Sequence, residues 1–343
     1  MPGITVAVLT NAAGAHLGAY LAGLAVTEEV EAVVVADPSG ESEASAKKTL
    51  GAKLKSFERD HVKALADHKP AMALVTMEAV QSPPVIQAAL EANCHVLAEK
   101  PSCLRAEDFE PLVRLADMKH RNLSLALANR LLGSVQAARK LIQSGQIGKI
   151  FGNELHIVAD QTRLKSPTYH QSWFADRARS GGGHLIWLGI HWLDLVMFMT
   201  GSKIVEAAGF IGNVGGQPLK IEDSASMALR FDNGSFGTMT SGYYLDRGYH
   251  SHIKIWGSHG WLLLDLHGGE PLQWYSTKET PPQIKKYDGP VEQTNYTSLI
   301  KECARAAMGL VPPPLTGAES LHALKTVFAC YRAAETGQSQ QVS

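Results

Sequence analysis

The sequence has no block of lysine and arginine, few cysteines and no excess of charge of one sign, and each absence narrows the class of protein. It carries 32 Lys and Arg against 33 Asp and Glu, a formal net charge of -1. An even balance without a basic cluster predicts neither a nucleic-acid partner nor an anionic membrane surface as partner. The cysteines Cys94, Cys103, Cys303 and Cys330 form no C-x-x-C pair. We interpret them as reduced thiols and expect a cytoplasmic protein.

Two further absences concern membranes. The opening residues MPGITVAVLT lack a basic region followed by a long apolar one, so we expect no signal peptide. We also expect no apolar run long enough to span a bilayer. With 45% hydrophobic and 19% charged residues the chain is neither disordered nor fibrous. Its 343 residues exceed one ordinary core, which predicts two globular domains.

The first third of the chain alternates short, valine-rich runs with helical patterns. The runs expected to be strands are residues 4–10, 30–38, 72–77, 95–101 and 123–129. Helical patterns such as HLGAYLAGLA and PPVIQAALEAN lie between them. Runs that are apolar throughout and separated by helices predict a parallel sheet covered on both faces. We therefore predict an α/β fold that begins with a doubly wound, NAD(P)-binding Rossmann domain over residues 1–128.

After about residue 150 the apolar residues alternate with polar ones instead. IFGNELHIVA, ASMALRF, GSFGTMTSGYY, SHIKIWGS and GWLLLDLH all show this pattern, and an Asn-Gly turn in FDNGSFG predicts a hairpin. The pattern predicts a large, mainly antiparallel sheet with one open face. We predict an α+β domain over residues 129–343 for substrate binding and oligomerisation, whose last helix is able to pack back on the Rossmann domain. We expect a homodimer or homotetramer formed through the open face.

The turn after the first strand, TNAAGAHLG, predicts an anion site for a pyrophosphate. A strand, a turn of small residues and a helix N-terminus combine there, and Asn11, Ala12 and Gly14 are the expected cofactor contacts. The usual G-x-G-x-x-G pattern is not intact. Asp37 ends the second strand, where a carboxylate accepts hydrogen bonds from a ribose diol and repels a 2′-phosphate. This favours NAD over NADP, although Asp37 would also suit the cap of a turn before Pro38.

The segment HVLAEKPSC at 95–103, followed by GGG and G-x-H-x-x-D-L, resembles the Gfo/Idh/MocA family of dehydrogenases. The likeness covers nearly the whole chain, since residues 129–150 and the closing helix also resemble family segments. The resemblance implies that Lys100 lies beside the nicotinamide and touches the reacting hydroxyl. It implies that Glu99 meets the nicotinamide ribose and that Pro101 follows a cis bond. His191 takes the position of the family's active-site histidine.

Besides the incomplete glycine fingerprint, the chain departs from the family pattern in two motifs. The family's T-P-N-x-x-H segment reads MEAVQS at 77–82, so Met77 stands at the start of an expected cofactor contact. The family's D-x-G-x-H reads WLGIH at 187–191, so Trp187 replaces an aspartate that binds substrate. Trp187 either fills the space of a missing substrate group or stacks on a sugar ring. Asp194 either orients His191 or pairs with a basic group elsewhere.

Aromatic and polar residues gather in two segments where the resemblance places a substrate pocket. The expected substrate contacts are Tyr169, Trp173, His184, Trp187, Tyr244 and Arg247, and the same segments carry Arg179 and Tyr249. Such residues suit polyhydroxylated substrates, because rings stack on sugars and hydroxyls need donors and acceptors. They would equally suit the solvent face of a sheet or a subunit interface. His250 and His252 share a strand face, but without a third ligand at suitable spacing we predict no metal.

The three glycines at 181–183 predict a close approach of the backbone to substrate or cofactor. The sequence as a whole predicts an NAD(H)-dependent oxidoreductase acting on a secondary hydroxyl or ketone of a sugar, glycoside or cyclic polyol. Lys100 and His191 are the expected catalytic residues, because a histidine of pKa ~6.5 accepts a proton near neutral pH. Two alternatives are a non-catalytic NAD-binding sensor or regulator and an enzyme that cleaves glycosides through transient oxidation.

Overall fold

The computed structural model describes residues 3–12, 14–292 and 296–343. The chain forms two compact units. The first comprises Met1–Ala128, Ala178–Gly181 and Asn295–Leu321, and the second comprises Asn129–Arg177, Gly182–Thr294 and His322–Ser343. The first unit thus contains two short pieces of chain that come from beyond residue 128.

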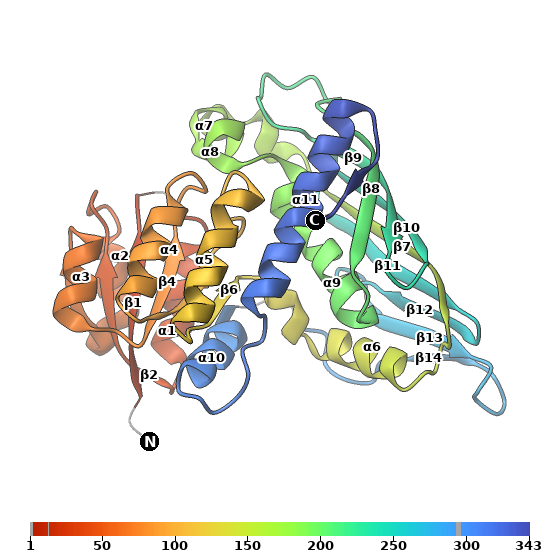
Figure 1. The fold of residues 1–343 in the computed structure, drawn as a ribbon, viewed down its shortest axis with the longest axis horizontal. Coiled ribbons are helices and arrows are strands. Elements are labelled where there is room, and N and C mark those ends of the chain that lie inside the picture. The colour runs from red at the N-terminus through yellow and green to blue at the C-terminus, as the bar shows by residue number, and fades with distance from the viewer. Residues whose placement is uncertain (1–2, 13, 293–295) are drawn as a thin grey trace. The chain divides into compact units, whose positions relative to one another are not determined.

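A parallel sheet of six strands forms the centre of the first unit (Figure 1). Its strands are β1 (Ile4–Thr10), β2 (Val30–Ala36), β3 (Leu54–Glu58), β4 (Met72–Thr76), β5 (His95–Ala98) and β6 (Leu123–Leu125). Their order is β3-β2-β1-β4-β5-β6, so the direction of winding reverses between β1 and β4. Every residue of β4 is buried, as expected for a strand covered on both faces. The predicted Rossmann domain is confirmed, although β3 was not expected.

Helices cover both faces of this sheet. They are α1 (Leu17–Val26), α2 (Glu43–Leu50), α3 (His61–His68), α4 (Ser82–Glu91), α5 (Ala106–Met118) and α10 (Tyr296–Ala307). α4 lies between α3 and α5 on one face, and α1 lies beside α2 and α10 on the other (Figure 1). The contact of α1 with α10 is close, because a Cβ on Gly23 would lie 2.6 Å from a methyl of Ile300. A late segment of the chain thereby covers the first helix.

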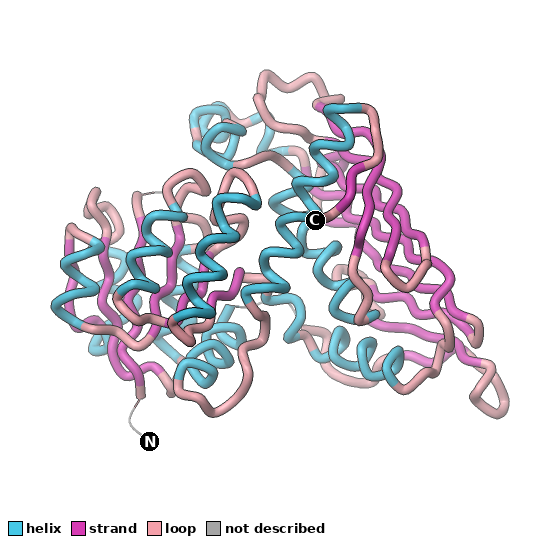
Figure 2. The backbone as a smooth tube through the Cα atoms, viewed as in Figure 1, coloured by secondary structure: helices cyan, strands magenta, loops and turns pink. Residues whose placement is uncertain are grey.

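A sheet of nine strands dominates the second unit, and its strands are the magenta tube segments at the right of Figure 2. Its strands are β7 (Ile150–Asp160), β8 (Ile204–Gly212), β9 (Ser224–Phe231), β10 (Phe236–Leu245), β11 (Tyr249–Gly257), β12 (Gly260–Leu264), β13 (Leu272–Ser276), β14 (Ile284–Lys286) and β15 (Gln340–Gln341). Their order is β14-β13-β12-β11-β7-β10-β9-β8-β15, and all pairs are antiparallel except β7 with β10. The mainly antiparallel sheet and its β9–β10 hairpin are confirmed.

The two faces of this sheet differ in burial. Leu155 and Ile253 point to one face and are buried, while Phe210 and Phe236 point to the other and are 86% and 59% exposed. The remaining helices are α6 (Gly133–Gln143), α7 (Pro167–Gln171), α8 (Arg177–Ser180), α9 (Ile190–Thr200) and α11 (Gly317–Thr336). α9 packs against β7 and α6. Alternation of burial therefore gives the second unit one covered face and one face that presents large apolar side chains.

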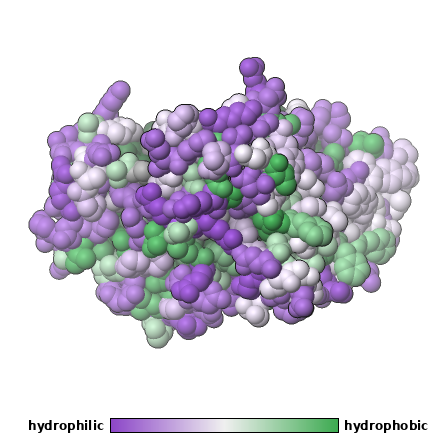
Figure 3. Space-filling model, turned by 90° about the horizontal axis from the view of Figure 1, so that it is seen from above, coloured by the Kyte–Doolittle hydropathy of each residue, from purple (hydrophilic) through white to green (hydrophobic). Residues whose placement is uncertain are grey.

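The helical stretch Arg177–Thr200 is, among the described residues, the one segment long and apolar enough to cross a membrane. The expectation that no apolar run reaches this length was wrong for this segment. In the protein 83% of its apolar window is buried, as is usual for a core helix. The surface in Figure 3 is largely hydrophilic, with apolar residues interspersed.

Candidate cofactor and substrate sites

The carboxyl ends of β1 and β4 meet at the point where the sheet changes its direction of winding. Thr10 pairs with Thr76, so Asn11 and Met77 follow neighbouring strand ends. Gly14 belongs to the turn above them, and a Cβ on it would lie 2.3 Å from Thr10 Oγ1 and 2.6 Å from the Thr76 carbonyl oxygen. Only glycine fits this contact. A switch point of this kind is where open α/β sheets bind nucleotides.

The N-terminus of α1 follows this turn and has no acidic residue of its own. The cap residue His16 makes no side-chain hydrogen bond to the helix, and the first turn contains no acidic residue. Its amide groups are therefore suited to a phosphate. Ala12 is exposed at the turn. Asn11 Nδ2 donates to Gln81 Oε1 at 2.6 Å, while its buried Oδ1 has no hydrogen-bond donor among the described residues.

Glu99 and Lys100 follow β5, the next strand of the sheet, and each is 3% exposed. The predicted cis bond between Lys100 and Pro101 is confirmed. Glu99 Oε2 accepts hydrogen bonds from the Tyr20 hydroxyl and from His16 Nδ1, the latter at 3.1 Å. Its other oxygen, Oε1, is buried and has no donor among the described residues. A buried acceptor of this kind fits a ribose hydroxyl.

Sequence reasoning missed the residues that hold Glu99. Tyr20 is fully buried, and burial together with the charge of Glu99 raises its pKa well above the usual value, so it remains a donor. The Tyr296 ring covers both partners, with centroids 4.6 Å from Tyr20 and 5.2 Å from His16. The spacing of His16 and Tyr20, four apart on one helix face, is the one signal that pointed to this set.

Asp37 is fully buried and caps the turn after β2. Its Oδ1 accepts from the Ser39 amide and hydroxyl at 3.0 and 2.7 Å, and its Oδ2 accepts from those of Ser42 at 3.0 and 2.7 Å. Burial raises the pKa of Asp37, but these four hydrogen bonds outweigh burial and lower it overall. All four lone-pair sites of the carboxylate are occupied. The capping interpretation therefore describes Asp37 as it stands, and a ribose contact requires one of these bonds to be exchanged.

Arg59 reaches the same turn from the end of β3, and sequence reasoning missed it because it lies far along the chain from Asp37. Its Nη1 donates to the Ser39 carbonyl at 2.8 Å, and its Nη2 lies 3.7 Å from Glu43 Oε2. A Cβ on Gly40 would collide with its guanidinium. A cation therefore borders the turn that carries Asp37.

In the second unit, Gly183 makes room for a buried carboxylate of the protein itself. Glu222 accepts hydrogen bonds from the amides of Gly183 and Leu185 at 2.6 and 3.0 Å and from the Tyr331 hydroxyl at 2.7 Å. A Cβ on Gly183 would lie 1.9 Å from the Glu222 carbonyl oxygen. Burial raises the pKa of Glu222 against these donors. Gly183 therefore lies against Glu222, and its approach to substrate or cofactor stays a prediction.

His184, an expected substrate contact, is fully buried, and its contact with substrate stays a prediction. Its Nδ1 lies 2.6 Å from Ser241 Oγ, and the edge of its ring meets Tyr243 at a centroid distance of 4.5 Å. Burial lowers the pKa of His184 to about 3, so the ring is neutral. A π-helical turn at Leu185–Gly189 follows it and leads into α9.

Trp187 belongs to a cluster of three aromatic rings. Its centroid is 5.3 Å from that of Trp173 and 5.0 Å from that of Phe174, both in edge-on geometry. Trp187 and Trp173 are 8% and 2% exposed, so neither offers an open face. Packing is the role that the structure supports for Trp187. Phe174, which the sequence did not single out, is the half-exposed member of the cluster.

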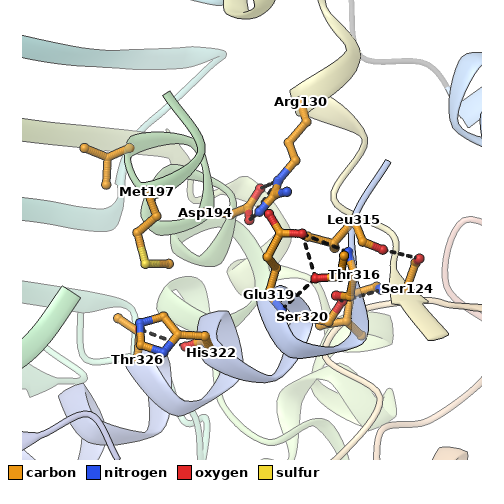
Figure 4. A network of polar contacts seen from close by, with 12 residues as sticks. Ser124, Arg130, Asp194, Met197, Leu315, Thr316, Glu319, Ser320, His322 and Thr326 are labelled. Carbon is orange, nitrogen blue, oxygen red and sulfur yellow. Dashed lines mark hydrogen bonds and ion pairs between the residues drawn. The ribbon is translucent and has the colours of Figure 1, made fainter. Parts of the chain in front are cut away.

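Asp194 pairs with a basic residue, the second of its two expected roles. Arg130 Nε and Nη2 lie 2.9 and 2.6 Å from its carboxylate oxygens, and both residues are buried (Figure 4). His191 lies half-buried near the start of α9. The geometry thus fixes α9 through Asp194 and leaves the role of His191 as a prediction.

Of the expected contacts near β10, the structure separates Tyr169 from Tyr244 and Arg247. Tyr169 packs on the covered face with Tyr243. Tyr244 alternates to the opposite face and is 44% exposed, and Arg247 lies exposed in the turn before β11. Tyr243, not Tyr244, is therefore the residue of this pair beside His184, because neighbouring residues in a strand point to opposite faces.

Two other residues from the expected pocket segments bind protein groups. Arg179 holds Glu78 with contacts of 2.8 and 2.5 Å, in the segment that departs from the family's T-P-N pattern. His252 lies 3.1 Å from Glu154 Oε1 and stacks on His156. Among the described residues no group of three His, Cys, Asp or Glu is placed to hold a metal ion.

A six-stranded doubly wound sheet with a nucleotide switch point, followed by an open-faced α+β unit, defines a class of dinucleotide-binding oxidoreductases. Residues 9–127 match the model of the oxidoreductase family with an NAD-binding Rossmann fold, and residues 135–263 match the GFO/IDH/MocA C-terminal domain. The chain belongs to the Gfo/Idh/MocA family.

Among curated proteins, the chain is 24% identical to 1,5-anhydro-D-fructose reductase of Ensifer adhaerens over 74% of each chain. It is also 24% identical to D-xylose 1-dehydrogenase [NADP(+)] of Haloarcula marismortui, over 82% of this chain and 77% of that one. Other curated relatives match over about half of their own length. For D-glucoside 3-dehydrogenase of Escherichia coli the identity is 24% over 46% of this chain and 48% of that protein.

Among solved structures, an oxidoreductase domain protein from Kribbella flavida has a TM-score of 0.90 at 21% identity, over 100% of both chains. Levoglucosan dehydrogenase in complex with NADH and L-sorbose has a TM-score of 0.86 at 18% identity, also over 100% of both chains. These likenesses establish the fold of the whole chain.

Proposed function

We propose that this protein is an NAD(H)-dependent oxidoreductase that transfers a hydride between nicotinamide and a secondary hydroxyl or ketone of a sugar, glycoside or cyclic polyol. The observation that carries the proposal is the placement of Glu99 and Lys100. They follow β5, next to the switch point of the sheet, and Glu99 keeps a buried oxygen with no donor among the described residues.

The residues of the first unit fit a dinucleotide. The turn at Asn11–Gly14 and the N-terminus of α1 would hold the pyrophosphate, and Glu99 Oε1 would accept from the nicotinamide ribose. Asp37 ends β2 as a carboxylate of lowered pKa, and its negative charge favours NAD over NADP. When bound, the nicotinamide supplies or accepts the hydride.

The chain itself supplies the proton chemistry in this proposal. Lys100, buried at the end of β5, holds the reacting hydroxyl by donating a hydrogen bond to its oxygen. His191 takes the hydroxyl proton during oxidation and returns it during reduction. Neither role depends on Asp194, whose carboxylate pairs with Arg130.

The relatives support this chemistry and substrate class. Curated relatives are named as a reductase of 1,5-anhydro-D-fructose and as dehydrogenases of D-xylose and D-glucosides. These names do not favour a non-catalytic sensor or a glycoside-cleaving enzyme. Because one relative is named for NADP(+), the preference for NAD rests on Asp37 alone.

A substitution of Lys100 tests the proposal. Lys100→Met is expected to lower kcat by about 100-fold or more, the usual contribution of a group that acts on the reacting proton, with Kd for NADH unchanged. Lys119→Met, at the half-buried residue that follows α5, is the control and should change neither quantity. Full turnover by Lys100→Met on every sugar that the wild type oxidises would reject the role of Lys100.

We further infer that the protein works in the cytoplasm as a homodimer or homotetramer. The four cysteines are free and buried thiols, which suits a reducing compartment. The outward face of the second sheet presents Phe210, Phe236 and Trp256, and a second copy would remove these side chains from water.

A further inference from the structure

Arg163 is an exposed arginine that aromatic residues hold in place. It lies in the helical turn Thr162–Lys165 after β7. Its guanidinium carbon is 5.4 Å from the centroid of the Tyr243 ring, and Tyr249 is near enough to interact electrostatically with the guanidinium. We call Arg163, Tyr243 and Tyr249 the arginine platform. A guanidinium fixed in this way loses little further freedom when it binds a ligand.

The arginine platform lies at one end of the second sheet, on its covered face. Tyr243 and Tyr249 both pair with Ala159, from the strands on either side of β7. Tyr243 also contacts the edge of the His184 ring. His184 begins the helical segment that carries His191 two turns later. The platform therefore belongs to the same part of the second unit as the proposed catalytic histidine.

Arg163 has no carboxylate within ion-pair distance among the residues that the structure describes, in contrast to Arg177. The guanidinium of Arg177 also lies over a tyrosine ring, 5.0 Å from the centroid of Tyr331, but it contacts Glu335 at 2.6 Å. Two arginines with the same ring contact thus differ in their counter-ion. Of these two arginines, Arg163 is the one whose positive charge is available to a ligand.

The groups around Arg163 do not neutralise it. Burial raises the pKa of Tyr169 to about 12, raises that of Tyr243, and lowers that of His184 to about 3. All three are uncharged at neutral pH. Asp160 lies at longer range, where its carboxylate accepts from the Thr162 amide at 2.7 Å.

Three more charged or titratable groups complete the surroundings of the platform. His267 stacks on Tyr249 at a centroid distance of 4.5 Å, and burial lowers its pKa, so it is neutral. The Glu222 carboxylate is bound by two amides and a phenol of the protein. Arg247 adds a second positive charge near Asp160. Both carboxylates near the platform, Asp160 and Glu222, thus already accept hydrogen bonds from amides of the protein.

We propose that the arginine platform binds a carboxylate group of the substrate, so that the sugar or polyol taken by this protein is an acid of the uronate class. A planar guanidinium matches a carboxylate through two parallel hydrogen bonds. Tyr169 packs against Tyr243 of the platform and keeps its phenol proton at neutral pH. The inference deepens the proposed function but is tested by binding, without turnover.

Calorimetry with a matched pair of ligands tests the proposal. Methyl glucuronoside and methyl glucoside differ at one carbon, and each is titrated into the full chain with and without NADH. The wild type is expected to bind the glucuronoside more tightly. Arg163→Met should weaken its binding about ten- to hundredfold, the range for hydrogen bonds to a charged group, and leave the glucoside unchanged. Arg177→Met is the control, and it should keep the wild-type preference.

Several outcomes would overturn the proposal. They are equal binding of the two ligands by the wild type, no binding of the glucuronoside at millimolar concentration, and an unchanged preference in Arg163→Met. Tighter binding of glucose 6-phosphate than of the glucuronoside would replace the carboxylate by a phosphate and reject the uronate class. Glucuronoside binding that depends on Arg163, in a protein that does not bind NADH, would reject the proposed function and support the platform.

Discussion

Trp187 stands where the family carries a substrate-binding aspartate, and its surroundings decide what restoring that aspartate would do. The side chain is 8% exposed and is packed edge-on against Trp173 and Phe174. Trp187→Asp would bury a carboxylate among aromatic rings and leave a large cavity. We expect a loss of about 3–5 kcal/mol in the free energy of unfolding, measured by urea denaturation.

Trp187→Phe is the matched control, because it keeps an aromatic ring in the cluster and should cost less than Trp187→Asp. A Trp187→Asp protein that is as stable as the wild type and oxidises a different set of sugars would contradict this account. It would show that Trp187 lines the substrate pocket.

His184 makes the stability of the protein depend on pH. Burial lowers its pKa to about 3, against an ordinary value of 6.5. Below pH 6.5 the unfolded chain binds a proton at this residue and the folded protein does not. The free energy of unfolding therefore decreases as the pH is lowered below 6.5, by about 1.4 kcal/mol per pH unit for this one group.

His184→Asn keeps a donor or acceptor near Ser241 and removes the titrating ring. The slope of unfolding free energy between pH 6 and pH 4 should therefore be smaller in the variant than in the wild type, by the roughly 1.4 kcal/mol per unit that one proton contributes. The same slope in both proteins would mean that His184 titrates normally in the folded state.

At the residue scale, the sequence predicted a local backbone feature but not the distant partners of buried polar residues. The cis bond before Pro101 followed from a local motif. The role of Glu222 was not predicted, because its donors Gly183 and Tyr331 are distant in sequence. The one signal in the sequence was the pair of adjacent acidic residues before β9. Asp37 kept two interpretations open until Ser39 and Ser42 were seen to occupy its oxygens.

At the scale of elements, the position of α9 depends on the buried pair between Arg130 and Asp194. Arg130 precedes α6, and Asp194 lies in the middle of α9. Arg130→Met would leave the Asp194 carboxylate buried without this partner, so we expect the free energy of unfolding to fall by about 3–5 kcal/mol. Denaturant titration measures it.

The double variant Arg130→Met with Asp194→Leu separates the pair from its surroundings. Replacing both charges by apolar groups should cost less than Arg130→Met alone, because no unpaired charge then remains in the core. If the losses of unfolding free energy in Arg130→Met and Asp194→Leu add up to the loss in the double variant, the pair does not couple α9 to the rest of the unit.

Patterns in the sequence predicted strands where apolar residues alternate or run together. They did not predict which strands pair in parallel or where a helix changes its hydrogen-bond pattern. The β9–β10 hairpin followed from its Asn-Gly turn. The parallel pairing of β7 with β10 did not, because alternation is the same for parallel and antiparallel neighbours in an open sheet. The π-helical turn at Leu185–Gly189 changes which residues of the segment share a face, and no pattern in the sequence predicted this turn.

At the scale of the whole molecule, we expect the outward face of the second sheet to join copies of the chain. Light scattering at micromolar concentration should give a dimer or tetramer. Phe210→Asp combined with Phe236→Asp should give a monomer, because two large exposed side chains lie on that face. Met118→Asp, 72% exposed on α5, is the control and should not change the mass. A wild-type monomer would contradict the expectation.

The central claim is that the first unit binds a nicotinamide cofactor and that the protein uses it for redox chemistry. Titration of NADH with the full chain, followed by the cofactor's fluorescence, tests this most directly. We predict saturable binding of NADH, tighter than that of NADPH, and oxidation of the bound cofactor when a keto sugar is added. No change in fluorescence at millimolar cofactor would contradict the account.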